Sequence, residues 1–136
     1  MQGKAVQVIV MRPPAPQTKA HFNRRNQVLR TLADYAKQQK PPLILMGDFN
    51  TTSWSLYWRE FVQRSGLRSA SLGHGLHLTW YYAKPTKAFS STHWLFQLIK
   101  IPIDHIFVSQ NVHVDRVTTA PPGVSDHRPL IVNIRV

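Results

Sequence analysis

The chain has 136 residues, of which 43% are apolar and 10% aromatic, a composition typical of a folded globular protein. Seventeen Lys and Arg against six Asp and Glu give a net charge of +11, which favours polyanionic partners such as nucleic acid, phosphorylated small molecules or an anionic membrane surface. The absence of cysteine excludes disulfides, thiolate zinc sites and a cysteine nucleophile. We expect one domain, residues 1–136, that is large enough to bury a core. The net charge alone does not show whether the protein binds a polyanion or is only kept soluble by its basic residues.

The N-terminal part predicts a strand followed by a helix. Residues 5–10 (AVQVIV) are rich in β-branched side chains and predict the strand, which a Pro-rich stretch ends. Apolar residues at helical spacing then predict a helix over residues 21–39, with Thr18 or Asn23 as its N-cap. A pair of prolines at 41–42 stops this helix.

A second strand and a second helix follow. Residues 43–46 form a continuous apolar run, which is typical of a strand buried on both faces. Residues 55–64 predict a helix, and Gly66 is placed to end it. The chain therefore begins as an α/β arrangement.

The second half of the chain predicts mainly strands. Residues 78–82, 103–109, 112–118 and 130–136 each have strand character, and the last two alternate between apolar and polar side chains. Residues 83–100 carry no clear period and receive no assignment. Two helices among such strands predict one mixed or antiparallel sheet, without an evident linker.

The acidic residues are few and unevenly placed. Half of them stand beside Asn, His or a strand end: Asp48, Asp104 and Asp126. This placement indicates chemistry rather than solubility. The other three lie in stretches that are typical of solvated surface: Asp34, Glu60 and Asp115.

The segment Gly47-Asp48-Phe49-Asn50 directly follows the buried strand. Glycine lets the backbone turn sharply where the strand ends. An aspartate there can orient or deprotonate a water, and the asparagine amide can donate to a phosphoryl oxygen. An Asx-type turn explains the same residues equally well.

The segment Ser125-Asp126-His127 lies just before the last strand. Its carboxylate can bind a cation while the imidazole acts on phosphate; a polar loop is the alternative. Asp104 lies in an apolar strand, where an unpaired charge is costly. We therefore expect it to pair with His127 and to fix its tautomer, with a structural pair to an arginine as the alternative.

In combination, GDFN after an apolar strand, IDHIFVS in a strand and SDHRPL before the last strand resemble the endonuclease/exonuclease/phosphatase superfamily. This family includes pancreatic deoxyribonuclease, abasic-site endonucleases, sphingomyelinases and inositol-polyphosphate phosphatases. The resemblance extends from Val6 to Val136. It implies an α/β (α+β) fold: half of a four-layer β-sandwich with flanking helices and a mixed or antiparallel sheet.

The resemblance implies a role for each motif residue. Asp48 positions or activates the attacking water, and Asn50 binds phosphate. Asp104 orients His127, the catalytic imidazole that holds the phosphate. Asp126 is the metal-side carboxylate, and the implied cofactor is Mg²⁺ or Mn²⁺.

The chain departs from the family pattern in two ways. Family members carry an Asn and a metal-binding Glu upstream of these motifs, whereas the one glutamate here, Glu60, falls in the second predicted helix. The chain thus resembles the C-terminal half of the family domain, without the principal metal ligand. In addition, Arg12 stands where some bacterial relatives have a histidine. Arginine binds phosphate but is no proton shuttle at neutral pH.

Several further side chains are candidates for holding substrate. Arg12 and Arg128 can bind phosphate, and Trp54, just past GDFN, can stack on a base. Solvated surface is the alternative for the basic residues near the motifs, which also include Arg24, Arg25, Lys84 and Lys87.

Other features favour structural roles. His74 and His77 lack nearby carboxylates, so a metal pair is disfavoured there. His105, next to Asp104 in a strand, points to the opposite face and is expected to be structural. The apolar stretch at residues 94–101 is expected to contact the core or a partner.

Two functions remain open at this point. The first is a metal-dependent hydrolase of phosphate esters, in a fragment impaired on its own; the second is a non-catalytic basic module that binds nucleic acid or phospholipid head groups. Because half a sandwich leaves an apolar sheet face uncovered, we expect a homodimer or a missing N-terminal half to cover it. No run is long enough to span a membrane, so this chain is expected to be soluble; a membrane anchor in a parent protein stays open.

Overall fold

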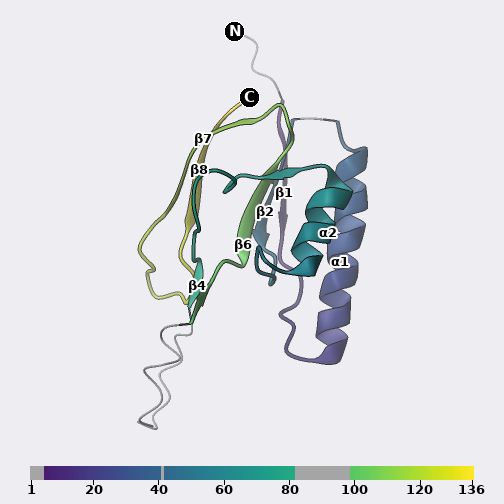
Figure 1. The fold of residues 1–136 in the computed structure, drawn as a ribbon, viewed down its shortest axis with the longest axis vertical. Helices are drawn as coiled ribbons and strands as arrows, with labels where there is room; N and C mark the ends of the chain where they lie inside the picture. Colours follow the sequence, from purple (N-terminus) through teal and green to yellow (C-terminus); the bar gives the residue numbers. More distant parts are fainter. Residues whose placement is uncertain (1–4, 41, 82–98) are drawn as a thin grey trace.

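The computed structural model describes residues 5–40, 42–81 and 99–136 (Figure 1). The two helices are α1 (Lys19–Gln38) and α2 (Leu56–Ser65). The strands, in chain order, are β1 (Gln7–Met11), β2 (Leu43–Asp48), β3 (Arg68–Ser69), β4 (Trp80–Tyr81), β5 (Lys100–Ile101), β6 (Asp104–Val108), β7 (His113–Thr119) and β8 (Leu130–Arg135).

Both helices begin and end where local chemistry dictates. The Thr18 hydroxyl accepts from the His21 N–H at 3.1 Å, so Thr18 caps α1 and Asn23 lies inside the helix. The helix therefore starts two residues earlier than the apolar spacing predicts. Ser55 caps α2 through the Tyr57 N–H, and Gly66 ends it at φ 70°, as predicted.

The four-stranded sheet is mixed. Its order is β1-β2-β6-β3, with β1 parallel to β2 and the other pairs antiparallel. The short strands β3 and β5 have only two residues each and carry no sequence period. The strand predicted over residues 78–82 is reduced to Trp80–Tyr81 among the described residues, paired with β5.

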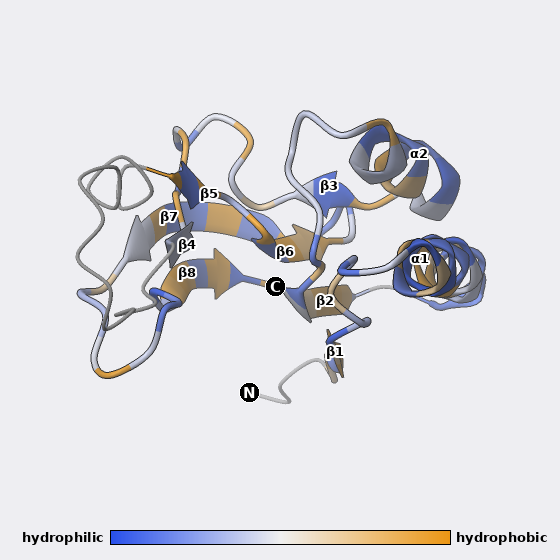
Figure 2. Ribbon diagram, turned by 90° about the horizontal axis from the view of Figure 1, so that it is seen from below, coloured by the Kyte–Doolittle hydropathy of each residue, from blue (hydrophilic) through white to orange (hydrophobic). Residues whose placement is uncertain are grey.

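The two faces of this sheet have different covers (Figures 1 and 2). Helices α1 and α2 lie on one face and enclose a core of aliphatic and phenyl side chains: Leu29, Ala33, Ala36, Leu43, Leu45, Phe49, Phe61, Leu67 and Phe107. The β7–β8 pair lies on the other face, over a second, mostly valine core: Ile44, Ala70, Val108, Val112, Val114 and Val117. This sandwich confirms the predicted mixed α/β class.

The cover is incomplete at the β1 edge. Val8 is 51% exposed and Val10 73% exposed, although both belong to an apolar strand. The uncovered apolar surface is therefore a strip at one edge, and not the whole sheet face that the sequence analysis expects, because β7 and β8 cover most of that face. What covers it, a second copy or an N-terminal half, stays a prediction.

Some predictions fall outside the described residues. Lys84 and Lys87, considered above as phosphate ligands, belong to this group, and so does most of the apolar stretch at 94–101. Among the helices that are described, none has the length and apolar character needed to cross a bilayer.

Candidate active site

Two carboxylates meet at one end of the sheet because of strand register. Strand β2 ends at Asp48, and its antiparallel neighbour β6 begins at Asp104; the two residues are paired directly across the strands. Like charges at such positions repel each other. A sheet that keeps this arrangement must stabilise it by other contacts.

Gly47 holds Asp48 in place by lacking a side chain. A Cβ on Gly47 would lie 1.9 Å from the backbone oxygen of Met11 on β1, and its φ is 144°. The expected sharp turn is therefore wrong: Gly47 lies within β2, and the glycine is required because the β1 backbone approaches closely.

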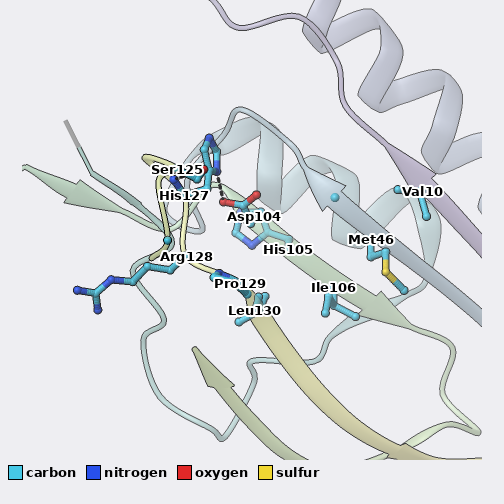
Figure 3. Close-up of a pocket in the computed structure, with 12 residues that line it drawn as sticks. Val10, Met46, Asp104, His105, Ile106, Ser125, His127, Arg128, Pro129 and Leu130 are labelled. Carbon is cyan, nitrogen blue, oxygen red and sulfur yellow. Dashed lines mark hydrogen bonds and ion pairs between the residues drawn. The ribbon is translucent and has the colours of Figure 1, made fainter. Parts of the chain in front are cut away.

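His127 completes the group from the far end of the chain. Its Nδ1 lies 2.8 Å from Asp104 Oδ2, the pairing that the sequence predicts, and the two side chains point toward each other in Figure 3. Its Nε2 lies 4.0 Å from Asp48 Oδ2. An Nδ1–H that donates to Asp104 leaves Nε2 free to face Asp48. The three motif segments therefore converge.

Backbone contacts fix the position of the His127 loop. The Thr79 carbonyl accepts from the Arg128 N–H at 2.6 Å, while the Thr79 hydroxyl accepts from the Asp104 N–H at 3.1 Å. The Tyr81 hydroxyl donates to the Ser125 carbonyl at 2.7 Å. Thr79 is fully buried, and its two hydrogen bonds hold the backbone at Asp104 and at Arg128, the residue after His127. Nothing in the sequence signals this role.

Asp48 is the most enclosed acidic side chain. Burial raises the pKa of Asp48, and nearby Asp104 adds to this, while the Asn50 N–H and the charges of His127 and Arg12 oppose it. A raised pKa makes Asp48 a stronger base than an exposed aspartate.

Asn50 is held against Asp48. Its N–H donates to Asp48 Oδ1 at 2.9 Å, and its Nδ2 donates to the Pro13 carbonyl at 3.0 Å and to Asp48 Oδ2 at 3.3 Å. These are the contacts of an Asx-type turn, so the structural alternative describes this geometry too. To bind phosphate, Asn50 would have to exchange one of these bonds.

The remaining candidates differ in where they lie. Arg12 is exposed, and its Nε lies 3.3 Å from Asp48 Oδ2, so it stands at the site. Trp54 is 54% exposed. Arg128 extends away from the Asp–His pair in Figure 3, although its backbone anchors the loop. The structure brings together Arg12, Asp48, Asn50, Asp104 and His127.

The residues present do not by themselves fit a divalent metal. Enzymes that bind Mg²⁺ surround the ion with several oxygen ligands. All six carboxylates of the chain lie in the described residues, and no three potential ligands there are grouped to hold an ion. Asp126 Oδ2 instead accepts from Trp80 Nε1 at 3.0 Å. Asp126 as a metal ligand stays a prediction.

An open groove of about 420 Å³ leads away from the Asp–His pair. Its polar end is formed by Asp104, Ser125 and His127, and its walls by apolar side chains (Figure 3): Val10, Met46, Ile106, Pro129 and Leu130. The groove runs along the uncovered part of the sheet. It therefore continues the strip at β1 rather than forming a closed pocket.

His105 has the structural role predicted for it. It is buried, its Nε2 lies 2.8 Å from the Thr51 carbonyl, and its ring packs against Phe49 and Phe107. Burial lowers the pKa of His105, which favours the neutral ring. Through the Thr51 carbonyl, His105 thus supports the loop that begins with the GDFN segment.

Comparison with known proteins identifies the family of the chain. The sequence profile described as "Endonuclease/Exonuclease/phosphatase family" matches residues 3–127. The chain belongs to the endonuclease/exonuclease/phosphatase family. A UPF0294 protein of Vibrio parahaemolyticus is 30% identical over 105 residues, which is 77% of this chain and 32% of that protein. The chain thus spans about a third of this relative.

Solved structures show the same fold. A functionally unknown conserved protein from Enterococcus faecalis matches with a TM-score of 0.66 and 22% identity, over 98% of this chain and 51% of that one. The 3′ phosphatase NExo from Neisseria, bound to a product DNA hairpin, matches with a TM-score of 0.64 and 18% identity, over 95% and 61%. The mannosyl-6-phosphatase of Bacteroides thetaiotaomicron matches with a TM-score of 0.55 and 22% identity, over 95% of this chain and 50% of that one. The chain spans about half of these structures.

Proposed function

We propose that this chain provides the acid–base groups of a phosphoester hydrolase. One observation carries the proposal: side chains from three distant segments meet at one end of the sheet. Asp104 Oδ2 lies 2.8 Å from His127 Nδ1, and His127 Nε2 lies 4.0 Å from Asp48 Oδ2. Membership of the family supports the reaction class. Two structural neighbours are phosphatases, one of them bound to DNA, which supports a phosphomonoester substrate and nucleic acid as one possible carrier of it. A phosphodiester or a phospholipid head group stays part of the proposal without such support.

The geometry suggests how these groups act. An oxygen atom about 2.8 Å from both Asp48 Oδ2 and His127 Nε2 fits the gap between them. Asp48 takes a proton from water, the water oxygen forms the new bond to phosphorus, and the ester oxygen leaves and is protonated by solvent. In its doubly protonated form, His127 donates Nδ1–H to Asp104 and Nε2–H to a phosphoryl oxygen as negative charge develops there. Arg12 stands where its guanidinium reaches the same phosphate.

Metal dependence is general in this family. A Mg²⁺ or Mn²⁺ ion would neutralise phosphoryl oxygens when bound. Because the described carboxylates do not complete a ligand set, such an ion would need further ligands besides them. No step above depends on the ion.

Hydrolysis of bis-p-nitrophenyl phosphate and p-nitrophenyl phosphate tests the proposal, with Asp48→Ala and His127→Ala against the wild type. We expect both variants to lose roughly 10²-fold or more of the turnover. Equal turnover in all three proteins would overturn it. A matched control is Asp34→Ala, which removes a carboxylate on the far surface.

The net charge of +11 and the incomplete ligand set favour a second candidate, a non-catalytic module that binds phosphate-bearing polymers. It predicts binding that weakens steeply with salt and no turnover by the wild type. Fluorescence anisotropy with a labelled oligonucleotide, run beside the hydrolysis assay, separates the two functions.

A further inference from the structure

Arg25 is a buried cation without an acidic partner. It is 5% exposed in the second turn of α1, whereas the sequence places it on solvated surface or facing phosphate; its burial corrects both. All six carboxylates lie in the described part of the chain, and none there forms an ion pair with Arg25. A buried charge is retained only where other contacts stabilise it. Those contacts therefore indicate its role.

The guanidinium of Arg25 is fixed on several sides. Its Nη1 donates to the Asn50 carbonyl at 2.5 Å, and its Nε donates to Asn26 Oδ1 at 2.9 Å. Its Cζ lies 4.9 Å from the ring centroid of Phe22 and 5.4 Å from that of Tyr57. The cation thus joins both helices to the GDFN loop at one atom, the Asn50 oxygen.

The contact supports an uncommon backbone conformation at Asn50. Its φ of 49° lies in the left-handed region, which few residues other than glycine adopt, asparagine more often than most. The same residue donates its N–H and its amide to Asp48. The next carbonyl, of Thr51, is held by His105 at 2.8 Å. Two successive carbonyls of the loop are therefore held, one by Arg25 on α1 and one by His105 on β6.

We infer that Arg25 is a positioning residue: by holding the Asn50 carbonyl, it keeps the Asn50 amide and the Asp48 carboxylate in their working geometry. The inference rests on the proposed function of that site. Arg25 is too buried to touch substrate, so it acts through Asn50. Loss of this contact frees the loop to leave the left-handed conformation.

The NMR signals of the Asn50 side-chain amide test this in isotope-labelled protein, first in phosphate-free buffer and then during titration with inorganic phosphate. Arg25→Met is compared with Arg24→Met, which removes the same charge from the exposed neighbouring position, and with Leu32→Ala, which loosens the same helix further along. We expect Arg25→Met alone to move the Asn50 signals toward those of a solvated asparagine, and Arg25→Lys to restore them in part. With an active protein, kcat should fall roughly 10-fold to 100-fold with little change in KM.

Unchanged Asn50 signals in Arg25→Met would overturn the inference, and so would an equal shift in Leu32→Ala. If Arg25→Met does not fold, Arg25→Gln is read in the same way, and unchanged signals there overturn it too. If phosphate fails to move the Asn50 signals of the wild type, the proposed phosphate site fails. The comparison in phosphate-free buffer still decides the role of Arg25.

Discussion

The six carboxylates of this protein form two groups of three with different partners. On the surface each acid is paired with an arginine through two or more short contacts: Asp34 with Arg64, Glu60 with Arg30, and Asp115 with Arg135. At the sheet end the partners are mainly an imidazole, amides and an indole: Asp104 with His127, Asp48 with Asn50 and the exposed Arg12, and Asp126 with Trp80. The surface acids are thus each held by an arginine through at least two contacts, whereas among the described residues only Asp48 of the sheet-end acids contacts an arginine, at 3.3 Å.

The pKa values of the three surface acids and of Asp48 follow this difference in partners. The hydrogen bonds of the arginines lower the pKa of Asp34, Glu60 and Asp115, whereas burial raises that of Asp48. A lowered pKa makes a carboxylate a poor base, and a raised one makes it a better base. Acids that stabilise the surface and acids that serve chemistry are separated by environment rather than by residue type.

The largest expected effect comes from Gly47→Ala. The new methyl group would overlap the Met11 carbonyl, so β1 would have to leave β2 and Asp48 would lose its alignment. We expect loss of the folded state or of most of its thermal stability, measured by circular dichroism. Gly123→Ala is the control, because no atom lies within 4 Å of the added Cβ. Equal melting curves would contradict the close approach.

The variant Asp104→Asn tests the sheet-end acids through His127, the histidine that Asp104 contacts. We expect turnover to fall about 10²-fold to 10⁴-fold, because His127 loses the partner that fixes its tautomer. Asp115→Asn is a matched control, since Asp115 also contacts a histidine, His113, at 3.3 Å on the surface. Hydrolysis rates at fixed pH measure both, and a comparable loss in the control would remove the distinction between the groups.

The pH dependence of stability should have opposite signs for Asp48 and Asp34, one acid from each group. Because its pKa is raised, Asp48 favours folding below its unfolded pKa, and this contribution is lost as the pH rises through the raised folded value. Asp48→Asn should therefore gain stability relative to wild type as the pH rises from about 4 to 7. Asp34, with a lowered pKa, contributes stability above its unfolded pKa that is lost in acid.

Asp34→Asn should therefore lose stability relative to wild type as the pH rises from about 2 to 5, a lower window than the one in which Asp48→Asn changes. Urea unfolding of the three proteins at several pH values measures both differences. Parallel curves for the two variants would show that burial and arginine pairing do not set the two groups apart.

The smallest effect is expected for Glu60→Gln. The pair with Arg30 is exposed and screened, so the unfolding midpoint in urea should change little, and less still at high salt. Glu60 lies on α2, away from the site, so turnover should stay unchanged. A clear loss of activity would show that the one glutamate of the chain has a catalytic role after all.

Much of the site was predictable because its residues stand in motifs at strand ends. Asp48, Asp104 and His127 stand in short segments that are ambiguous one by one and gain meaning from their combination, which resembles the family. The Asp104–His127 pairing follows from the cost of an unpaired charge in an apolar strand. The helices and longer strands follow from periodicity and caps, to within a few residues. Beyond these, local sequence carries little information.

Only the tertiary structure decides contacts between distant segments. The need for glycine at 47 depends on how closely β1 approaches, and the roles of Thr79 and Arg25 depend on which backbone groups lie within reach of them. The strands β3 and β5 are too short to have a period and exist through pairing with β6 and β4. The sequence by itself determined which side chains can do chemistry; packing determined which of them meet, because neither close approach nor burial is a property of a single segment.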